Sequence, residues 1–211
     1  MCDIPAEFAT GVSMNRLGNM MNVHEALRSR RTVHRFRPDA VADDVVQRAL
    51  EAARWAPNHK LTNPWRFYWL GPEARASIGR IAASLVEESS RTSRDEDPKI
   101  RAMCENAESK VQDSPVLIAV SSRRLDDDAF REREDFAATA CAIQNMQLSF
   151  WGDEVGAKWS TGAVTRDRRI YPILGADEAQ ERIVGFVKAG YPEHVPTVPR
   201  KELDSVVSRL P

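Results

Sequence analysis

The sequence predicts a three-layer domain of the α+β or α/β class, in which helices cover a central sheet. Short segments rich in β-branched or aromatic residues alternate along the chain with segments whose apolar residues recur at helical spacing. No segment repeats and no low-complexity linker divides the 211 residues, so we expect one domain over residues 21–211. Residues 1–20 lack a cationic start followed by an apolar block, so we interpret them as a flexible N-terminal extension and not as a secretory signal.

Composition and charge exclude several classes of protein. The chain is 42% hydrophobic and its 30 Lys and Arg nearly balance its 31 Asp and Glu, which argues against a disordered tail and against a general nucleic-acid binder. The longest apolar run, Val116 to Val120, is far shorter than the ~20 residues of a membrane-spanning helix. Three widely spaced cysteines favour neither a disulfide framework nor a zinc site. We therefore expect a cytoplasmic protein without membrane or nucleic-acid partners.

The first two helices are predicted from their caps and their apolar spacing. Asn22 followed by Glu25 resembles a capping box at the start of a helix over residues 23–30. Asp43 or Asp44 is a candidate cap for a second helix, which should end before Pro57 because the residue preceding a proline disfavours helix. Residues 56–64 then form a loop.

The middle of the chain predicts a strand, two helices and a second strand. An aromatic-rich strand over residues 66–70 stops at Gly-Pro, and an amphipathic helix with its apolar face around residues 78–85 follows. Pro98 suits the first turn of the next helix, and we leave open whether the charged region 94–103 before and within it supplies a lid. A short buried strand is expected over residues 115–121.

The last third predicts a long helix and two strands. Residues 135–151 are apolar on nearly all sides and rich in small residues, and Gly152 supplies a stop. Burial on more than one side places this helix either centrally or in a subunit interface. Strands are expected over residues 157–160 and 183–189.

Several chemistries are excluded by missing motifs. The chain contains no glycine-rich nucleotide loop, no Walker sequence, no zinc-protease helix and no nucleophile elbow. Its four histidines show no metal-ligand spacing, and the Asp126-Asp127-Asp128 run is better interpreted as a solvated loop, so we expect no metal. One segment needs an explanation: RSRRTVHRFR, residues 28–37, holds five arginines and one histidine.

The order of four motifs identifies a family resemblance. RSRRTVHRF, EAARWAPNHKLTNPWRF, GAKWSTGA and GYPEHVPTVPRKELDSVV follow one another as in FMN-dependent nitroreductases, over residues 22–207. The loop resembles the subgroup with A-P-[DN]-H-K. The resemblance implies a nitroreductase-like α+β fold: a three-layer α/β/α sandwich with a central mixed, mainly antiparallel sheet. It also implies an intertwined homodimer with FMN at the subunit interface.

The arginine segment offers donors that suit a phosphate. Without a glycine-rich loop, a doubly charged phosphate needs guanidinium forks and hydroxyl groups, which Arg30, Arg31 and Thr32 provide. The resemblance assigns these three residues and Arg200 to FMN binding. On the residues alone, the alternative is an ordinary solvated basic face.

The resemblance implies further contacts to the flavin ring. Trp55 and His59 would touch the flavin of the partner subunit, and Trp159, Ser160, Thr161 and Gly162 would run along the ring. Glycine there would let the backbone approach closely. On the residues alone, the alternatives are that His59 is an ordinary loop histidine at a helix end and that Trp159 is a core aromatic at a strand end.

Three positions depart from the family pattern. His34 stands where many relatives have a lysine beside the ring, and Leu61 and Asn63 replace a usual asparagine and glutamine. A histidine can be neutral or charged near pH 7, so the stabilisation of a reduced, anionic flavin at His34 is open.

The resulting prediction is an FMN-dependent NAD(P)H oxidoreductase acting by a ping-pong cycle. NADH or NADPH would donate hydride, and a nitroaromatic, quinone or similar small-molecule acceptor would then occupy the same space, with no catalytic side chain required. Three alternatives remain open. They are a flavin-dependent reductase of one metabolite such as an enal or semialdehyde, a flavin-binding protein that is not an enzyme, and a nucleic-acid binder with a basic patch.

Overall fold

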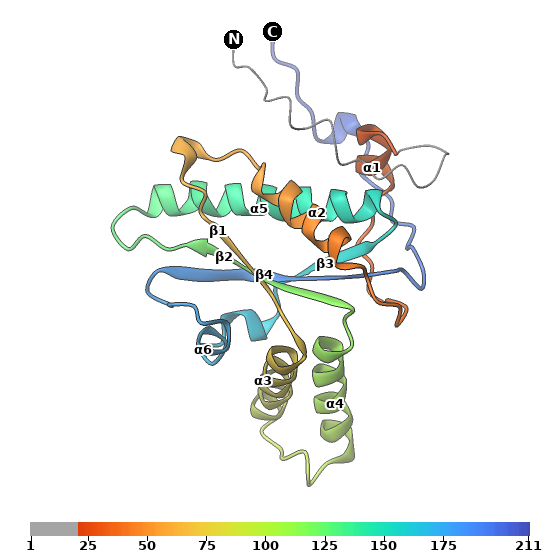
Figure 1. The fold of residues 1–211 in the computed structure, drawn as a ribbon, viewed down its shortest axis with the longest axis vertical. Helices are drawn as coiled ribbons and strands as arrows, with labels where there is room; N and C mark the ends of the chain where they lie inside the picture. Colours follow the sequence, from red (N-terminus) through yellow and green to blue (C-terminus); the bar gives the residue numbers. More distant parts are fainter. Residues whose placement is uncertain (1–20) are drawn as a thin grey trace.

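The protein folds as three layers, with a four-stranded sheet between two groups of helices. The computed structural model describes residues 21–211, so the predicted extension over 1–20 lies outside the described residues. In Figure 1, α2 and α5 lie on one face of the sheet, and α3, α4 and α6 lie on the other. The predicted α+β sandwich is therefore confirmed.

The sheet has the strand order β1-β2-β4-β3, and every pairing between these strands is antiparallel. A mainly antiparallel sheet was predicted and is confirmed. In the described part of the chain, the parallel component is a single isolated bridge between Thr32 and Ala157. The strands are β1 Trp65–Trp69, β2 Val116–Arg123, β3 Gly156–Ser160 and β4 Glu181–Gly190.

One helical layer consists of α2 (Asp43–Arg54) and α5 (Ala129–Gly152). Helix α5 begins at Ala129 and not at the predicted residue 135, because the Asp128 side chain accepts a hydrogen bond from the Arg131 N–H and caps the helix earlier. The prediction that Asp43 or Asp44 caps α2 is wrong. Ala42 is the cap residue and makes no side-chain bond, while the two aspartates lie in the first turn, where they favour the helix dipole.

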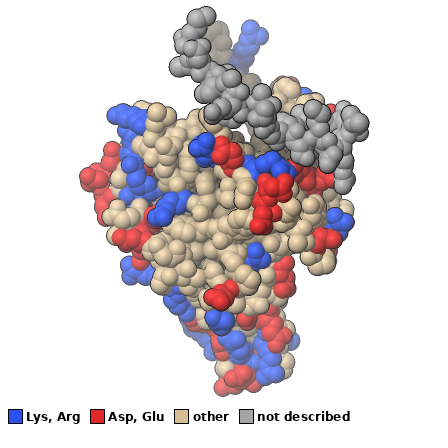
Figure 2. Space-filling model, in the orientation of Figure 1, with Lys and Arg blue, Asp and Glu red and all other residues tan. Residues whose placement is uncertain are grey.

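The other layer consists of α3 (Pro72–Ser90), α4 (Pro98–Gln112) and the short α6 (Ile170–Leu174). Each face of the sheet packs its own apolar cluster, and burial of these side chains is the main stabilising contribution. Figure 2 shows charged groups gathered toward the α3–α4 end and the upper margin, while uncharged residues occupy the middle of this face.

Short elements position the remaining loops. Helix α1 (Val23–Ser29) begins with the predicted capping box of Asn22 and Glu25. The predicted loop 56–64 contains a single 3-10 turn, η2 (His59–Leu61), in which Lys60 and Leu61 have positive φ. Two further 3-10 turns are η3 (Ala163–Arg166) and η4 (Leu203–Ser205).

Helix α5 is covered along one stripe only within this chain. Its buried residues recur at helical spacing against the sheet and α2, whereas Phe136 is 45% exposed and Ala137 and Cys141 are also exposed. Burial on more than one side is not achieved by a single chain. The intertwined homodimer therefore stays a prediction.

Candidate functional site

A cavity of about 280 Å³ lies between the arginine segment, α5 and β3. The Val33 N–H donates to the Ala157 carbonyl at 3.2 Å, and this contact holds the arginine segment along β3. The cavity joins two of the predicted phosphate donors with a predicted ring residue and two glutamines that sequence reasoning missed. Its lining is Arg30, Thr32, Ala140, Ile143, Gln144, Gln147 and Trp159.

Three predicted cations converge beside this cavity. Burial, together with the neighbouring guanidinium groups of Arg200 and Arg31, lowers the pKa of Arg30. The Arg31 guanidinium donates hydrogen bonds to the backbone carbonyls of Arg28 and Arg30. Among residues 21–211, no carboxylate forms an ion pair with Arg30, Arg31 or Arg200, which makes the cluster a candidate site for an anion.

Trp159 is fixed against the sheet beside that cluster. Its Nε1 donates to the Val184 carbonyl at 3.4 Å, and its ring packs so closely on Gly185 that any side chain there would collide with it. Beyond Ser160 the chain leaves the sheet, and Thr161 and Gly162 are exposed. A Cβ atom added to Gly162 would meet no other atom within 4 Å, so this side of the backbone is open to a ligand.

His34 lies in a second, polar cavity of about 640 Å³ on the α4 side of the sheet. Lys158 Nζ lies 3.3 Å from His34 Nδ1, a geometry in which a neutral imidazole accepts from the ammonium. Lys158 is also the cross-strand partner of Lys188. Burial and the nearby Lys158 and Lys110 lower the pKa of Lys188 to about 8. Sequence reasoning missed both strand lysines, although each interrupts an otherwise apolar strand.

Trp55 and His59 lie elsewhere. His59 Nδ1 is 3.1 Å from the Glu134 carboxylate in the N-terminal half of α5. From Glu134 to Gln144 and Gln147 is ten to thirteen residues, or roughly 15–20 Å along a helix. Trp55 follows the end of α2, is 60% exposed and donates from Nε1 to Glu51 at 2.9 Å. One chain therefore does not bring His59 to the arginine cavity.

The loop that carries His59 is anchored from below. Thr62 Oγ1 donates to the buried Asp135 at 2.8 Å, and Arg123 pairs with the same carboxylate at 2.6 Å. The Asn63 N–H donates to Asn58 Oδ1, while Leu61 is 80% exposed. Asn63 is thus bound within the loop, and Leu61 presents its side chain outward.

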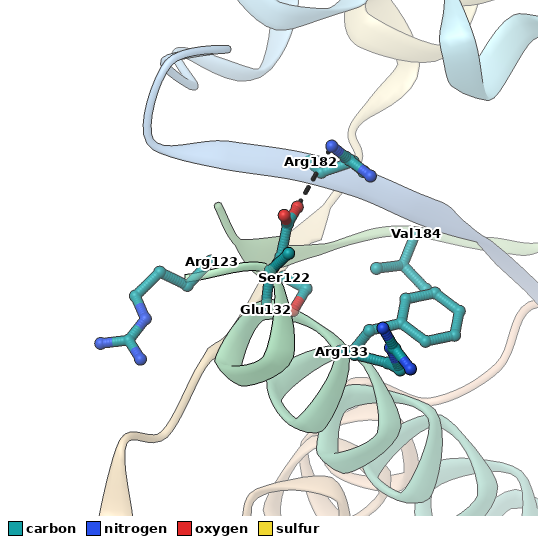
Figure 3. A pocket seen from close by; sticks show the side chains of 8 residues that line it. Ser122, Arg123, Glu132, Arg133, Arg182 and Val184 are labelled. Atoms are coloured by element: carbon teal, nitrogen blue, oxygen red, sulfur yellow. Dashed lines mark ion pairs between the residues drawn. The ribbon is translucent and has the colours of Figure 1, made fainter. Parts of the chain in front are cut away.

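A third cavity of about 230 Å³ opens at the same end of α5, between Ser122, Arg133 and Val184 (Figure 3). Arg182 pairs there with Glu132 at 3.1 Å, and the Arg123 side chain points away from the cavity. Its arginines do not converge on one point as the cluster at Arg30 does.

Two kinds of feature are absent from residues 21–211. No group of three or more His, Cys, Asp or Glu side chains has the arrangement of a metal site. No helix in this part of the chain has the length and apolarity to cross a membrane.

Comparisons with known proteins agree on one family. Residues 27–191 match the model described as "Nitroreductase family". A Bacillus subtilis protein with the provisional name NAD(P)H nitroreductase YfhC is 29% identical over 180 residues, which is 85% of this chain and 89% of the relative. Two crystal structures are each 25% identical to this chain. A nitroreductase-like family protein from Bacillus cereus has a TM-score of 0.75, with 92% of this chain and 99% of that chain covered. A Desulfovibrio desulfuricans protein, provisionally named a nitroreductase and crystallised in complex with FMN, has a TM-score of 0.68, with 89% and 96% covered.

Proposed function

Because the chain belongs to the nitroreductase family, we propose that it is an FMN-dependent oxidoreductase that takes hydride from NADH or NADPH and reduces nitroaromatic, quinone or similar electron-poor acceptors. The observation that carries the proposal is that Arg30, Thr32 and Trp159 line one cavity, while no carboxylate of the described residues forms an ion pair with Arg30. The FMN-bound relative and the relative named for NAD(P)H support the choice of cofactor and donor.

The donor set suits the phosphate of FMN. Arg30, Arg31 and Arg200 supply guanidinium groups, and the Thr32 hydroxyl adds a neutral donor on the same segment. Charge-assisted hydrogen bonds to a phosphate are stronger than neutral ones, and partial burial of Arg30 strengthens them further. Gln144 and Gln147 of α5 add amide donors and acceptors for the neutral parts of the cofactor.

The ring lies along the segment Trp159, Ser160, Thr161 and Gly162 in this proposal. FMN, when bound, supplies the redox chemistry by accepting hydride from the nicotinamide and passing electrons on to the acceptor. The chain's own part is to hold the ring, to leave one side open at the exposed Thr161 and Gly162, and to place cations near its edge. In this proposal His34 reaches that edge from the separate cavity on the α4 side of the sheet, where it lies 3.3 Å from Lys158.

The site is completed by a second copy of the chain. The open stripe of α5 around Phe136 and Cys141 is the face expected to pack in a homodimer. A two-fold axis across α5 would carry His59 and Trp55 of each protomer toward the partner's cavity, which removes the gap of roughly 15–20 Å along the helix. FMN at the interface is thus part of the proposal.

The cycle is ping-pong in this proposal. Donor and acceptor use the same open space beside Thr161 and Gly162 in turn, so the donor leaves before the acceptor enters. No side chain acts as nucleophile or obligatory general acid.

An anaerobic titration tests the function. The FMN-loaded protein is titrated with NADH and separately with NADPH while the visible flavin absorbance is followed. Bleaching by either donor, and recovery of the absorbance on adding a nitroaromatic or a quinone, is the expected result. A flavin that binds but stays oxidised with both donors would instead indicate a flavin-binding protein that is not an enzyme.

A further inference from the structure

Two cavities, one polar and one apolar, adjoin each other on the α4 side of the sheet, and we refer to them together as the cleft with a polar and an apolar half. Each has a volume of about 640 Å³, and both are lined by Lys110 and Lys188. The polar half extends from these two lysines past Lys158 to His34. The apolar half extends the other way, between α3, α4 and η3. Such a cleft suits a ligand with a charged end and an apolar body.

In the polar half, Lys158 and Lys188 form no ion pair with any carboxylate of the described residues. Lys158 and Lys188 face each other across β3 and β4, a pairing of like charges that destabilises a sheet. Lys188 Nζ donates to the Lys110 carbonyl, which fixes the ammonium without neutralising it. Asp113 and Glu193 also line the cavity, yet neither forms an ion pair with these lysines in the described part of the chain. A bound anion would offset the repulsion.

The apolar half begins at the proposed flavin ring segment. Val164 belongs to η3, whose first residue follows Gly162 directly. Across the cleft lie side chains of α3 and α4, and most of the cleft surface is apolar. They include Ala82, Leu85, Val86, Ala107 and Val111.

We propose that this cleft selects acceptors that carry a carboxylate on an electron-poor aromatic or conjugated body. The carboxylate binds Lys158 and Lys188, and the body lies between α3, α4 and η3, next to Gly162. The inference rests on the proposed function, because it names the substrate class of the same site. It goes beyond that function by assigning selectivity to two strand lysines.

A matched pair of probes tests the proposal without turnover. 4-Nitrobenzoate and 4-nitrobenzamide have nearly the same shape and differ in charge. Each is titrated by calorimetry into the oxidised, FMN-loaded protein with no NAD(P)H present. We expect the carboxylate to bind about tenfold more tightly than the amide, as one charge-assisted hydrogen bond predicts.

Substitutions assign the preference to the two lysines. Lys158→Met and Lys188→Met should each bring the affinity for 4-nitrobenzoate close to that for 4-nitrobenzamide. Lys99→Met removes an exposed lysine at the start of α4, outside the cleft lining, and should keep the wild-type preference. Lys158→Arg and Lys188→Arg retain the charge and should also keep it, which guards against a Met variant that folds poorly.

A pH series adds a second readout. The charged and titratable groups that line the cleft are His34, Arg35, Lys110, Asp113, Lys158, Lys188 and Glu193 in its polar half, and Glu88, which pairs with Arg169, in its apolar half. Since burial and Lys158 lower the pKa of Lys188 to about 8, the preference for the carboxylate should fall as the pH rises past 8, and this fall should be absent in Lys188→Met.

Equal affinities in the wild-type protein, or a preference that persists in both Met variants, would overturn the proposal. The anaerobic titration of the FMN-loaded protein with NADH and NADPH separates this proposal from the proposed function. A lysine-dependent preference combined with a flavin that NAD(P)H does not reduce would support the anion cleft and contradict the reductase. Flavin reduction without any preference would do the opposite.

Discussion

The two ends of α5 differ in whether the charged side chains there have partners of opposite charge. At the N-terminal end each of three carboxylates has a cationic or imidazole partner: Glu132 with Arg182, Glu134 with His59, and Asp135 with Arg123. In the C-terminal half, Gln144 and Gln147 face the cavity of Arg30, and the described residues provide no carboxylate for that arginine. At the N-terminal end the three carboxylates are paired within the chain, whereas Arg30 beside the C-terminal half has no carboxylate partner among the described residues.

This difference separates residues that hold the fold from residues that await a ligand. A buried charge with its partner costs stability when the partner is removed, whereas a cation without a partner contributes little to folding and much to binding an anion. Substitutions at the N-terminal end should therefore change stability. Those at the C-terminal half should change affinity for FMN.

The largest effect is expected at Asp135. Asp135→Ala removes two contacts of a buried carboxylate, one to the part-exposed Arg123 and one to Thr62, so the free energy of unfolding should fall by about 3 kcal/mol in chemical denaturation. Asp126→Ala, which breaks an exposed pair with Arg124, is the control and should cost less than about 1 kcal/mol. A small loss for Asp135→Ala would end the distinction between the two ends.

Arg30→Ala should weaken FMN binding and leave stability unchanged. Loss of a charge-assisted contact to phosphate should weaken FMN binding by about 1.5–3 kcal/mol, or roughly ten- to a hundredfold, in a fluorescence titration. The flavin-free variant should unfold at the wild-type denaturant concentration, because Arg30 has no carboxylate partner to lose. Arg28→Ala, on exposed α1 surface, should keep wild-type affinity. Undiminished FMN binding by Arg30→Ala would remove the residue from the site.

Lys188 extends the comparison to the other face of the sheet. The lowered pKa of Lys188 means that the folded protein releases this proton near pH 8, while the unfolded chain keeps it to about pH 10.5. The contribution of Lys188 to the free energy of unfolding therefore rises as the pH rises between these two values. Lys188→Met should be more stable than wild type at pH 7 by about 1 kcal/mol, and the difference should shrink toward pH 10. Lys99→Met should show no such trend in the same urea series. A difference that grows with pH would contradict the assignment.

Among the ion-paired residues at the N-terminal end of α5, the smaller effect on stability is expected at His59. His59→Ala breaks an exposed pair with Glu134, so the free energy of unfolding should stay within about 0.5 kcal/mol of wild type. FMN affinity should nevertheless fall, because His59 is proposed to reach the partner's flavin. Lys60→Ala, which alters the neighbouring exposed residue, is the matched control. Unchanged FMN affinity in His59→Ala would place this loop outside the site.

The sequence was informative where a local signal fixes a local structure. The capping box at Asn22, the Gly-Pro stop after the aromatic strand and the apolar spacing of α2 and α3 each predicted an element that the structure contains. The start of α5 was missed because residues 129–134 are mostly charged, and the helix there depends on the Asp128 cap and on ion pairs with distant residues.

The candidate site was predictable only in part, for a similar reason. Arg30, Thr32 and Trp159 were found from motifs and do share one cavity. Gln144 and Gln147 belong to no recognisable motif, and they lie in a helix that the sequence predicts to be buried. The opposition of Lys158 and Lys188 depends on strand register across thirty residues, which no local pattern specifies.

The most direct test of a site shared between two chains is FMN binding to a mixed dimer. One chain carries Arg30→Ala, the other carries Trp55→Ala with His59→Ala, and the mixed species is purified through two different affinity tags. If each site is shared between two chains, one site combines the unaltered halves, and half of the FMN sites should retain wild-type affinity. Two weakened sites, with none at wild-type affinity, would place both groups in one chain's site and contradict the shared interface.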